Sequence, residues 1–321
     1  MSWQQAVQEC IQRAVRPEGL HLVISPDVDG ITATVLVTMY TRVHHDAPVV
    51  VIGTYDSEHL RLVEGYTVED TKHALWLDLD VNFNGNVKHV LGQHFLGNVQ
   101  VETPAYFNPN LFFDVRCNMG KKCPISTTHL VLWGLFGDEA IVPILQHKFS
   151  LARAAIAHAD SLYWIVDSYS KNVNHWAKQL FPTSSLPKTL QLLMDGEYHE
   201  HAAKVHHHFL TLIGPHLKST TFKPKDWATF RGHQTVKDED HLEHVRAMIH
   251  IVAQCFRNDP PSMGTQGRVA WKGKREYLNT MQYDWTDAHF QAQLREKGVV
   301  SHAIVNTQTV SATTAPQPLF V

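Results

Sequence analysis

Residues 20–43, LHLVI-SPDVDG-ITATVLVTMYTRV, decide the fold of this chain. The first five are mostly apolar and predict a short buried strand. Residues 25–30 combine Ser, Pro, Asp and Gly, which predicts a turn, and residues 31–43 are apolar over a length that suits a helix. A strand, an acidic turn and a helix in this order begin an α/β fold.

The same pattern extends in both directions. Apolar residues at helical spacing predict a first helix at 3–14, and continuous apolar runs predict strands at 49–52, 74–79 and 88–91. Apolar strands separated by helices favour a parallel sheet that is covered on both faces. In such sheets ligands bind just beyond the carboxyl ends of the strands.

The second half of the chain is mostly helical. Apolar periodicity, interrupted by prolines, predicts helices at 125–136, 140–147, 150–166, 171–181, 186–195, 197–213 and 242–256. Near the C-terminus, strands of a smaller α+β unit are predicted for RVAWKG, REYLNTM and SHAIVNTQTVSAT. We therefore predict an α/β domain at 1–168, a helical connector at 169–217 and a smaller α+β C-terminal domain at 218–321.

Composition limits the class of protein. The 321 residues are 18% charged and 44% hydrophobic with a net charge of -3, so nucleic acid would contact only a local basic patch. No apolar run reaches the roughly 18 residues of a membrane span, and the N-terminus lacks a signal-peptide pattern. Four cysteines are too few for a disulfide framework. We expect a cytoplasmic or other reducing compartment, no secretion and no membrane contact.

The 23 histidines invite a metal-site interpretation, but most of them lack the spacing. The cluster at 199–208 lies on a predicted helix and cannot form a compact zinc site by itself. Cys117 and Cys123 are too far apart for a zinc motif. Among the histidines, His94 has the strongest claim to be a metal ligand, and His158, near Asp160, is a weaker second candidate.

Acidic residues and one histidine follow predicted strands or end a helical run. They are Asp27 and Asp29, Asp78 and Asp80, His94, and Asp160. Paired aspartates in turns also serve as turn formers and helix caps. Their convergence on three strand ends favours a shared site, and carboxylates with one imidazole suit Mn²⁺ or Mg²⁺.

These stretches resemble the motifs of the DHH phosphoesterase superfamily, in the form of its RecJ-like branch. VISPDVDGITATVL resembles the first motif, WLDLD the second, VKHVLGQHFLGN the third and AAIAHADS the fourth. FNPNLFFDV and CPISTTHLVLWGL are similar to the segment after the third motif. The resemblance covers about residues 18–165, and the motifs keep the order and spacing of the family.

The resemblance implies a parallel-sheet DHH-like N-terminal domain and a metal-dependent phosphodiesterase. Its substrate would be single-stranded nucleic acid or oligonucleotides, and its cofactor Mn²⁺ or Mg²⁺. The metal ligands that it implies are Asp27, Asp29, Asp78, His94 and Asp160. Among these, the implied catalytic residues are Asp27, Asp78 and His94.

The chain departs from the family at three places. Ser25 stands where this branch has an acid, and Gly92-Gln93-His94 stands where Asp-His-His is expected. Either His94 matches the second histidine and Gln93 replaces the first, or Gln93 matches the aspartate and Phe95 replaces the last histidine. The Gly-Gly-His type motif of the family's second domain has no counterpart. The chain is then either a slow phosphodiesterase or a catalytically inactive DHH-like scaffold in a larger complex.

Substrate contacts are expected from Ser25 and Gln93 and from the most basic short stretch of the chain. That stretch contains Arg268, Lys272, Lys274 and Arg275, interleaved with Trp271 and Tyr277. Such a pattern suits phosphate contact and base stacking. A charged strand edge that prevents pairing with other chains would have the same composition.

Overall fold

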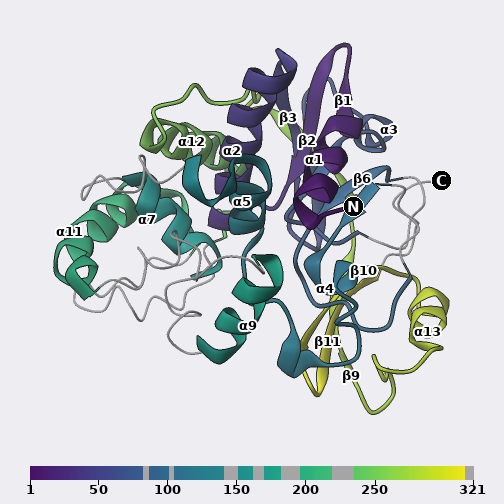
Figure 1. Ribbon diagram of the computed structural model, residues 1–321. Helices are drawn as coiled ribbons and strands as arrows, with labels where there is room; N and C mark the ends of the chain where they lie inside the picture. The colour runs from purple at the N-terminus through teal and green to yellow at the C-terminus, as the bar shows by residue number, and fades with distance from the viewer. Residues whose placement is uncertain are drawn as a thin grey trace. The chain divides into compact units, whose positions relative to one another are not determined.

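The computed structural model describes residues 1–81, 87–100, 105–140, 151–161, 170–181, 196–218 and 235–314. Figure 1 shows their helices and strands. Contacts between Cα atoms group the chain into two units. The sheet unit comprises residues 1–25, 47–123 and 263–321, and the helical unit comprises residues 26–46 and 124–262. The contacts thus group the chain differently from the three consecutive domains predicted from the sequence, whose boundary at 168 lies outside the described residues.

Within the described residues, the sheet unit contains an eight-stranded sheet in the order β7-β6-β5-β2-β3-β4-β8, with β1 paired to β2. The bounds are β1 (Val15–Arg16), β2 (Gly19–Ile24), β3 (Val49–Tyr55), β4 (His59–Val63), β5 (Leu75–Leu77), β6 (His89–Leu91), β7 (Ala105–Phe107) and β8 (Gly267–Lys272). Strands β2, β3, β5, β6 and β7 pair in parallel, whereas β1, β4 and β8 pair antiparallel. The predicted α/β class with a mostly parallel sheet is confirmed.

The strands form where the sequence is apolar on both sides of the backbone. In β2, Leu22, Val23 and Ile24 are all fully buried, as expected for a central parallel strand. Helix α1 (Trp3–Ala14) begins at a capping box and lies against β6 and β7, with the ring of Trp3 6.5 Å from that of Phe107. The short helices of this unit are α3 (Val68–Thr71), α4 (Pro109–Phe112) and α13 (Phe290–Glu296).

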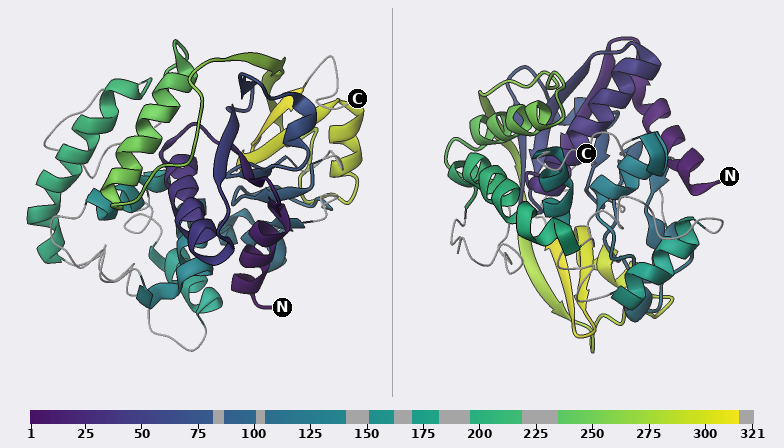
Figure 2. Two further views of the ribbon diagram at one scale, coloured as in Figure 1. Left: turned by 90° about the horizontal axis from the view of Figure 1, so that it is seen from above. Right: turned by 60° about the vertical axis from the view of Figure 1, so that its left-hand side comes forward.

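A second, smaller sheet completes this unit. Its antiparallel strands are β10 (Val299–Asn306), β11 (Thr309–Thr314) and β9 (Lys274–Asn279), in that order. We expected RVAWKG in the same small sheet, but it forms β8 and pairs with β4 in the large sheet. Gly273 separates β8 from β9, so the chain passes from one sheet to the other at this glycine. Figure 2 shows the small sheet in yellow.

The helical unit is built around a helix, α2, most of whose residues are buried. Its helices are α2 (Val28–His45), α5 (Thr127–Ala140), α7 (Leu151–His158), α9 (Ser170–Leu180), α11 (Gly196–Ile213) and α12 (His241–Cys255). Helix α2 packs against α5, α7 and α12, and α11 runs beside α12, the two green helices of Figure 2. Most of the helix predicted at 140–147 and all of that predicted at 186–195 lie outside the described residues. None of the described helices is long and apolar enough to cross a membrane.

Candidate functional site

Four of the predicted site residues lie just beyond the carboxyl ends of parallel strands in the large sheet. Asp78 directly follows β5, and Gln93 and His94 follow β6, which is parallel to β5. Ser25 directly follows β2, and its backbone N–H donates to the Leu77 carbonyl at 3.2 Å. The carboxyl ends of parallel strands are the usual location of ligand sites in such sheets.

Asp80, which the sequence places among the acids at strand ends but which the family resemblance does not imply as a ligand, is the centre of the polar contacts beyond these strands. Its Oδ2 accepts hydrogen bonds from the backbone N of His94 at 3.0 Å and from His94 Nδ1 at 2.8 Å. Its Oδ1 accepts from the Tyr106 hydroxyl and from Asn108 Nδ2, the latter at 3.0 Å. Each carboxylate oxygen has two lone pairs, so these four donors saturate the group. Asp80 therefore acts on a ligand only through the residues that it holds.

The environment keeps Asp80 ionised. Burial by itself would raise the pKa of Asp80, but hydrogen bonding and charge from His94, with hydrogen bonds from Tyr106 and Asn108, outweigh burial and lower the pKa below its usual value. Burial and the neighbouring Asp80 charge raise the pKa of Tyr106 well above its usual value. At neutral pH, Asp80 is therefore an anion and Tyr106 a neutral donor.

Gly92 makes room for this carboxylate. A Cβ atom at position 92 would lie 2.6 Å from both Oδ1 and Oδ2 of Asp80, far closer than side chains approach one another. The four donors hold the carboxylate, so it cannot move aside without losing hydrogen bonds. The backbone N–H of Gly92 donates to the Phe107 carbonyl at 3.0 Å, which also fixes the glycine. Only glycine fits here without displacing Asp80.

Two buried asparagines hold the loop after β6. Asn108 Nδ2 donates to the His94 carbonyl at 2.9 Å as well as to Asp80. Asn110 Nδ2 donates to the Gln93 carbonyl at 2.8 Å, and its Oδ1 accepts from the backbone N of Cys123 at 2.7 Å. Both asparagines are only 1% exposed. The sequence signal for them is the Asn-Pro-Asn of FNPN, to which we had assigned no side-chain contacts.

His94 is the residue whose orientation these contacts fix. Its side chain is 44% exposed, whereas that of Asp80 is 3% exposed. Because an ionised carboxylate only accepts hydrogen bonds, Nδ1 of His94 carries a proton, and in the neutral form of the ring the lone pair is therefore on Nε2. Metal-binding histidines donate their other ring N–H to a carboxylate in this way. His94 Nε2 can therefore bind a cation or accept a proton.

Asp78 is buried, with 3% exposure, and has a left-handed backbone with a φ of 60°. Its backbone N–H donates to the Leu91 carbonyl at 2.8 Å. Because β5 ends at Leu77 and the left-handed residue interrupts the extended chain, strand alternation does not relate the directions of the Asp78 and Asp80 side chains. Strained residues of this kind cluster at functional sites, although Asp tolerates the conformation better than most.

The other predicted ligands belong to the helical unit. Asp27 caps α2 by accepting from the backbone N of Gly30 at 2.9 Å. Asp29, 2% exposed, accepts from the backbone N atoms of Thr127 and Thr128 at 2.9 and 2.8 Å, at the start of α5. Both residues thus have the helix-capping contacts that are the alternative interpretation of paired aspartates. Asp160 is exposed and follows α7 in a left-handed conformation, with a φ of 50°.

The electrostatics of Asp29 differ from those of Asp80. Burial, followed by the charge of Asp27, raises the pKa of Asp29, and hydrogen bonds from Thr128 and Thr127 offset only part of this effect. The pKa of Asp29 is therefore raised above its usual value, whereas that of Asp80 is lowered.

A divalent cation needs more ligands than the side chains that follow β5 and β6 provide. In the part of the chain that the structure describes, no three His, Cys, Asp or Glu side chains form a group that could hold a metal ion. In the sheet unit, the donors that suit Mn²⁺ or Mg²⁺ are the Asp78 carboxylate and His94 Nε2. Such ions take about six ligands. A carboxylate and a neutral imidazole are donor types that such ions accept, but two residues provide fewer ligands than either ion takes.

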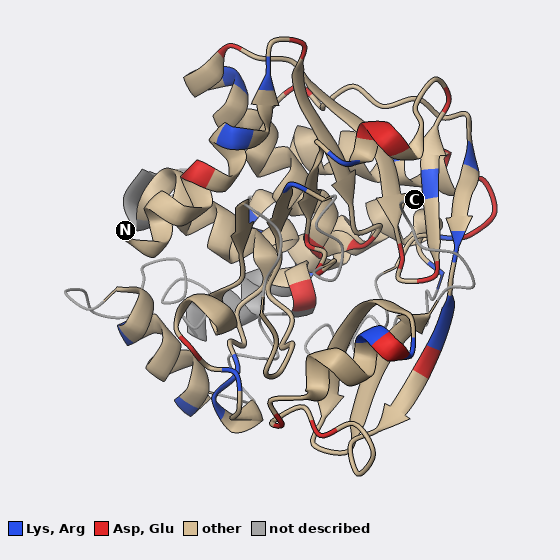
Figure 3. Ribbon diagram, turned by 90° about the vertical axis from the view of Figure 1, so that its right-hand side faces the viewer, with Lys and Arg blue, Asp and Glu red and all other residues tan. Residues whose placement is uncertain are grey.

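The predicted substrate-binding cations lie on edge strands. Among the described strands, β8 pairs only with β4 and β9 only with β11. Figure 3 shows blue segments along these two strands, with a red one toward the end of β9. Lys274 is 78% exposed and lies 3.2 Å from Glu276, while the Arg275 guanidinium lies 5.4 Å from the centroid of the exposed Tyr277 ring.

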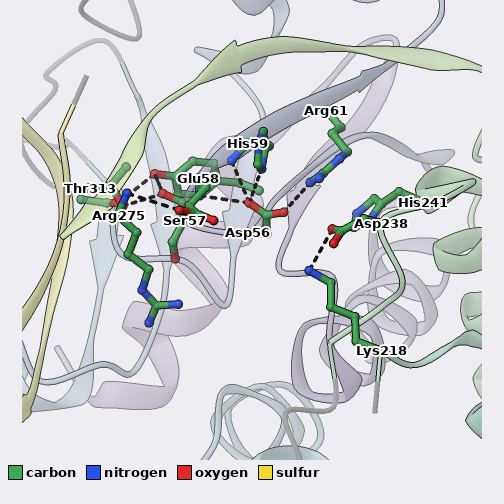
Figure 4. Close-up of polar contacts among 12 residues, drawn as sticks. Asp56, Ser57, Glu58, His59, Arg61, Lys218, Asp238, His241, Arg275 and Thr313 are labelled. Carbon is green, nitrogen blue, oxygen red and sulfur yellow. Dashed lines mark hydrogen bonds and ion pairs between the residues drawn. The ribbon is translucent and has the colours of Figure 1, made fainter. Parts of the chain in front are cut away.

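The turn between β3 and β4 contacts Gly273, which links the edge strands β8 and β9, and Thr313 in β11. The Glu58 carbonyl accepts from the backbone N of Gly273 at 2.7 Å, and Thr313 Oγ1 donates to the Ser57 carbonyl. Figure 4 shows the Asp56 carboxylate pointing toward Arg61 and His59. The edge strands are thereby fixed where the chain crosses between the two sheets.

Comparisons of the chain with protein-family models, with curated proteins and with solved structures find no match. The function must therefore be inferred from the chemistry of the residues. The structure places Ser25, Asp78, Gln93 and His94 at one sheet edge, adds Asp80, and puts the basic stretch on β8 and β9.

Proposed function

We propose that the protein is a slow, metal-dependent phosphodiesterase of the DHH type that acts on single-stranded nucleic acid or oligonucleotides. The observation that carries this proposal is the contact of 2.8 Å between Asp80 Oδ2 and His94 Nδ1 beyond β6, beside Asp78 beyond the neighbouring β5. An imidazole of fixed orientation and a buried acid at the carboxyl ends of parallel strands suit Mn²⁺ or Mg²⁺ binding.

The position of Asp80 supports the register in which Gly92-Gln93-His94 matches Asp-His-His. Its carboxylate fills the space of a side chain at residue 92, so an acid is present there although the motif position is glycine. Phe95, which the other register matches to the last histidine, is 3% exposed and packs on Trp285 with ring centroids 5.3 Å apart. Gln93 then replaces a histidine that the family uses as a metal ligand, which agrees with slow turnover.

In this proposal each residue has a separate role. Asp78 and His94 Nε2 would hold the metal, which when bound lowers the pKa of water and neutralises phosphate charge. Asp80 keeps the His94 proton on Nδ1. Asn108 and Asn110 hold the loop, so that the ring need not reorganise when a ligand binds. The other three ligands are predicted only from the sequence; they are Asp27, Asp29 and Asp160.

The substrate would be bound through phosphate contacts. Ser25 and Gln93 are at the same sheet edge as Asp78 and can donate hydrogen bonds to phosphate oxygens. Arg268, Lys272, Lys274 and Arg275 give the β8 and β9 edges an excess of positive charge. Tyr277, which is 65% exposed, offers a ring for stacking on a base.

A second candidate is a catalytically inactive DHH-like scaffold that binds nucleic acid or protein partners. The observation that favours it is that both carboxylate oxygens of Asp29 already accept hydrogen bonds from the start of α5. Such a protein would keep the fold and the basic edge but would not hydrolyse phosphodiesters.

The test is hydrolysis of short, end-labelled single-stranded DNA and RNA with Mn²⁺. Wild type should cleave, EDTA should abolish cleavage, and Asp78→Asn should lower the rate about 100-fold or more. Asp56→Asn is the matched control, because Asp56 is a partly buried aspartate of the same unit, with a side chain that is 9% exposed and binds Arg61. Asp29→Ala is a poor probe, since it also removes the cap of α5. If wild type binds the strands but cleaves none, the scaffold is favoured.

A further inference from the structure

We propose that Asp80 is a positioning residue that acts through His94, and that Gly92 is the residue that admits it. The inference rests on the proposed function, because it concerns the imidazole of that site. It assigns specific roles to two residues that the family resemblance does not imply as ligands or catalytic residues.

The first step is that one carboxylate oxygen of Asp80 accepts two hydrogen bonds from His94. Asp80 Oδ2 accepts both the backbone N–H and the Nδ1–H of His94, at 3.0 and 2.8 Å. The main chain and the ring of one residue are therefore tied to the same atom. A ring flipped by 180° would turn a C–H toward that oxygen and lose the second bond, so one ring orientation is selected.

The second step is that the carboxylate itself cannot turn. Tyr106 and Asn108 donate to Oδ1, and Asn108 also holds the His94 carbonyl. Rotation of the carboxylate would break contacts with both residues while the side chain is 3% exposed, out of reach of replacement by water. The position of Asp80 is thus set by groups that do not belong to the imidazole.

The third step concerns the proton. A neutral imidazole carries its proton on either nitrogen, and only the nitrogen without it can bind a cation or accept a proton. Asp80 holds the proton on Nδ1, inside the protein, so the lone pair is on Nε2 of a ring that is 44% exposed. A purely structural hydrogen bond would not need a half-exposed partner with a defined tautomer.

The experiment measures the tautomer of His94 in metal-free protein by long-range ¹H–¹⁵N correlation spectra. Because the chain has 23 histidines, a His94→Gln variant is needed to assign the signal. We expect the Nδ1–H form in wild type and a shift toward Nε2–H in Asp80→Asn, with no change in Asp56→Asn. Mn²⁺ affinity, followed by electron paramagnetic resonance, should fall about 10–100-fold in Asp80→Asn.

The outcomes separate this inference from the proposed function. An Nε2–H form in wild type, or an unchanged tautomer in Asp80→Asn, would overturn the role of Asp80. A shifted tautomer in a protein whose wild type neither binds Mn²⁺ nor cleaves would uphold that role and refute the phosphodiesterase. Gly92→Ala keeps the Asp80 charge but blocks its position, and the same shift is expected there. An unshifted tautomer in Gly92→Ala would overturn the role of Gly92 even if Asp80→Asn fails to fold.

Discussion

The carboxylate of Asp80 lies in the space that a side chain at Gly92 would need. Both oxygens would be 2.6 Å from a Cβ atom at residue 92, and four hydrogen bonds prevent the carboxylate from leaving. The two residues belong to loops after neighbouring parallel strands, so the close approach depends on the pairing of β5 with β6. This relationship leads to the first prediction.

Gly92→Ala should lower the free energy of unfolding by about 1–3 kcal/mol, because the methyl group displaces a buried, hydrogen-bonded carboxylate. Urea unfolding followed by circular dichroism measures the change. Gly120→Ala is the control, since a Cβ there meets only Asn118 Oδ1, at 3.3 Å. Equal stability of the two variants would contradict the prediction.

Asn110→Ala should destabilise the protein by about 1–3 kcal/mol, because it leaves the Gln93 carbonyl and the Cys123 N–H without their side-chain partner. It should also loosen the loop that carries His94, seen as faster amide hydrogen exchange at Gln93 and His94. Asn174→Ala is the comparison, because Asn174 is exposed on α9 and its replacement should cost less than about 0.5 kcal/mol. Unchanged exchange at the loop would argue against a holding role for Asn110.

Acid should destabilise the sheet unit through His302. Burial lowers the pKa of His302 to about 4, although a hydrogen bond to the Leu96 carbonyl and the Asp80 charge oppose this, and the unfolded value is about 6.5. The unfolded state therefore binds more protons between these values. The stability contributed by neutral His302 is complete above pH 6.5 and is lost as the pH falls toward 4.

His302→Gln should flatten this pH dependence, measured by urea unfolding between pH 7 and pH 4.5. The exposed His208 gives the control variant, His208→Gln, whose slope should match wild type. Some slope will remain in both variants, because burial also lowers the pKa of His129, to about 3. Identical slopes in His302→Gln and wild type would refute the assignment.

The basic edge should bind single strands through phosphate contacts. The double variant Lys272→Glu/Lys274→Glu should bind oligo(dT) more weakly in EDTA, and its affinity should depend less on salt. Each lost contact should reduce the salt slope by about 0.7. Fluorescence anisotropy at several salt concentrations measures both quantities, and Lys204→Glu on α11 is the exposed control. Unchanged binding would support the other interpretation, a charged edge that prevents strand pairing.

Elements whose signals are local can be predicted from the amino-acid sequence. The apolar run at 20–24 and the long apolar stretch after it became β2 and α2, and the helix predicted at 3–14 became α1 with the same bounds. The mostly parallel sheet followed because these strands are apolar on both faces. Short elements such as β4 and β7 were not predicted, since a few residues carry too little periodicity.

Which elements and side chains contact one another depends on the three-dimensional fold. The segment RVAWKG reads as a strand in any sheet, and its pairing with β4 depends on a partner more than 200 residues earlier, as in Arg61 with Val269. The sequence placed acids and His94 at strand ends, but it could not say that Asp80 would hold the ring or that Asn108 and Asn110 would hold the loop. The spacing and direction of neighbouring strands determine which groups can form hydrogen bonds with one another. The periodicity within one segment does not contain this information.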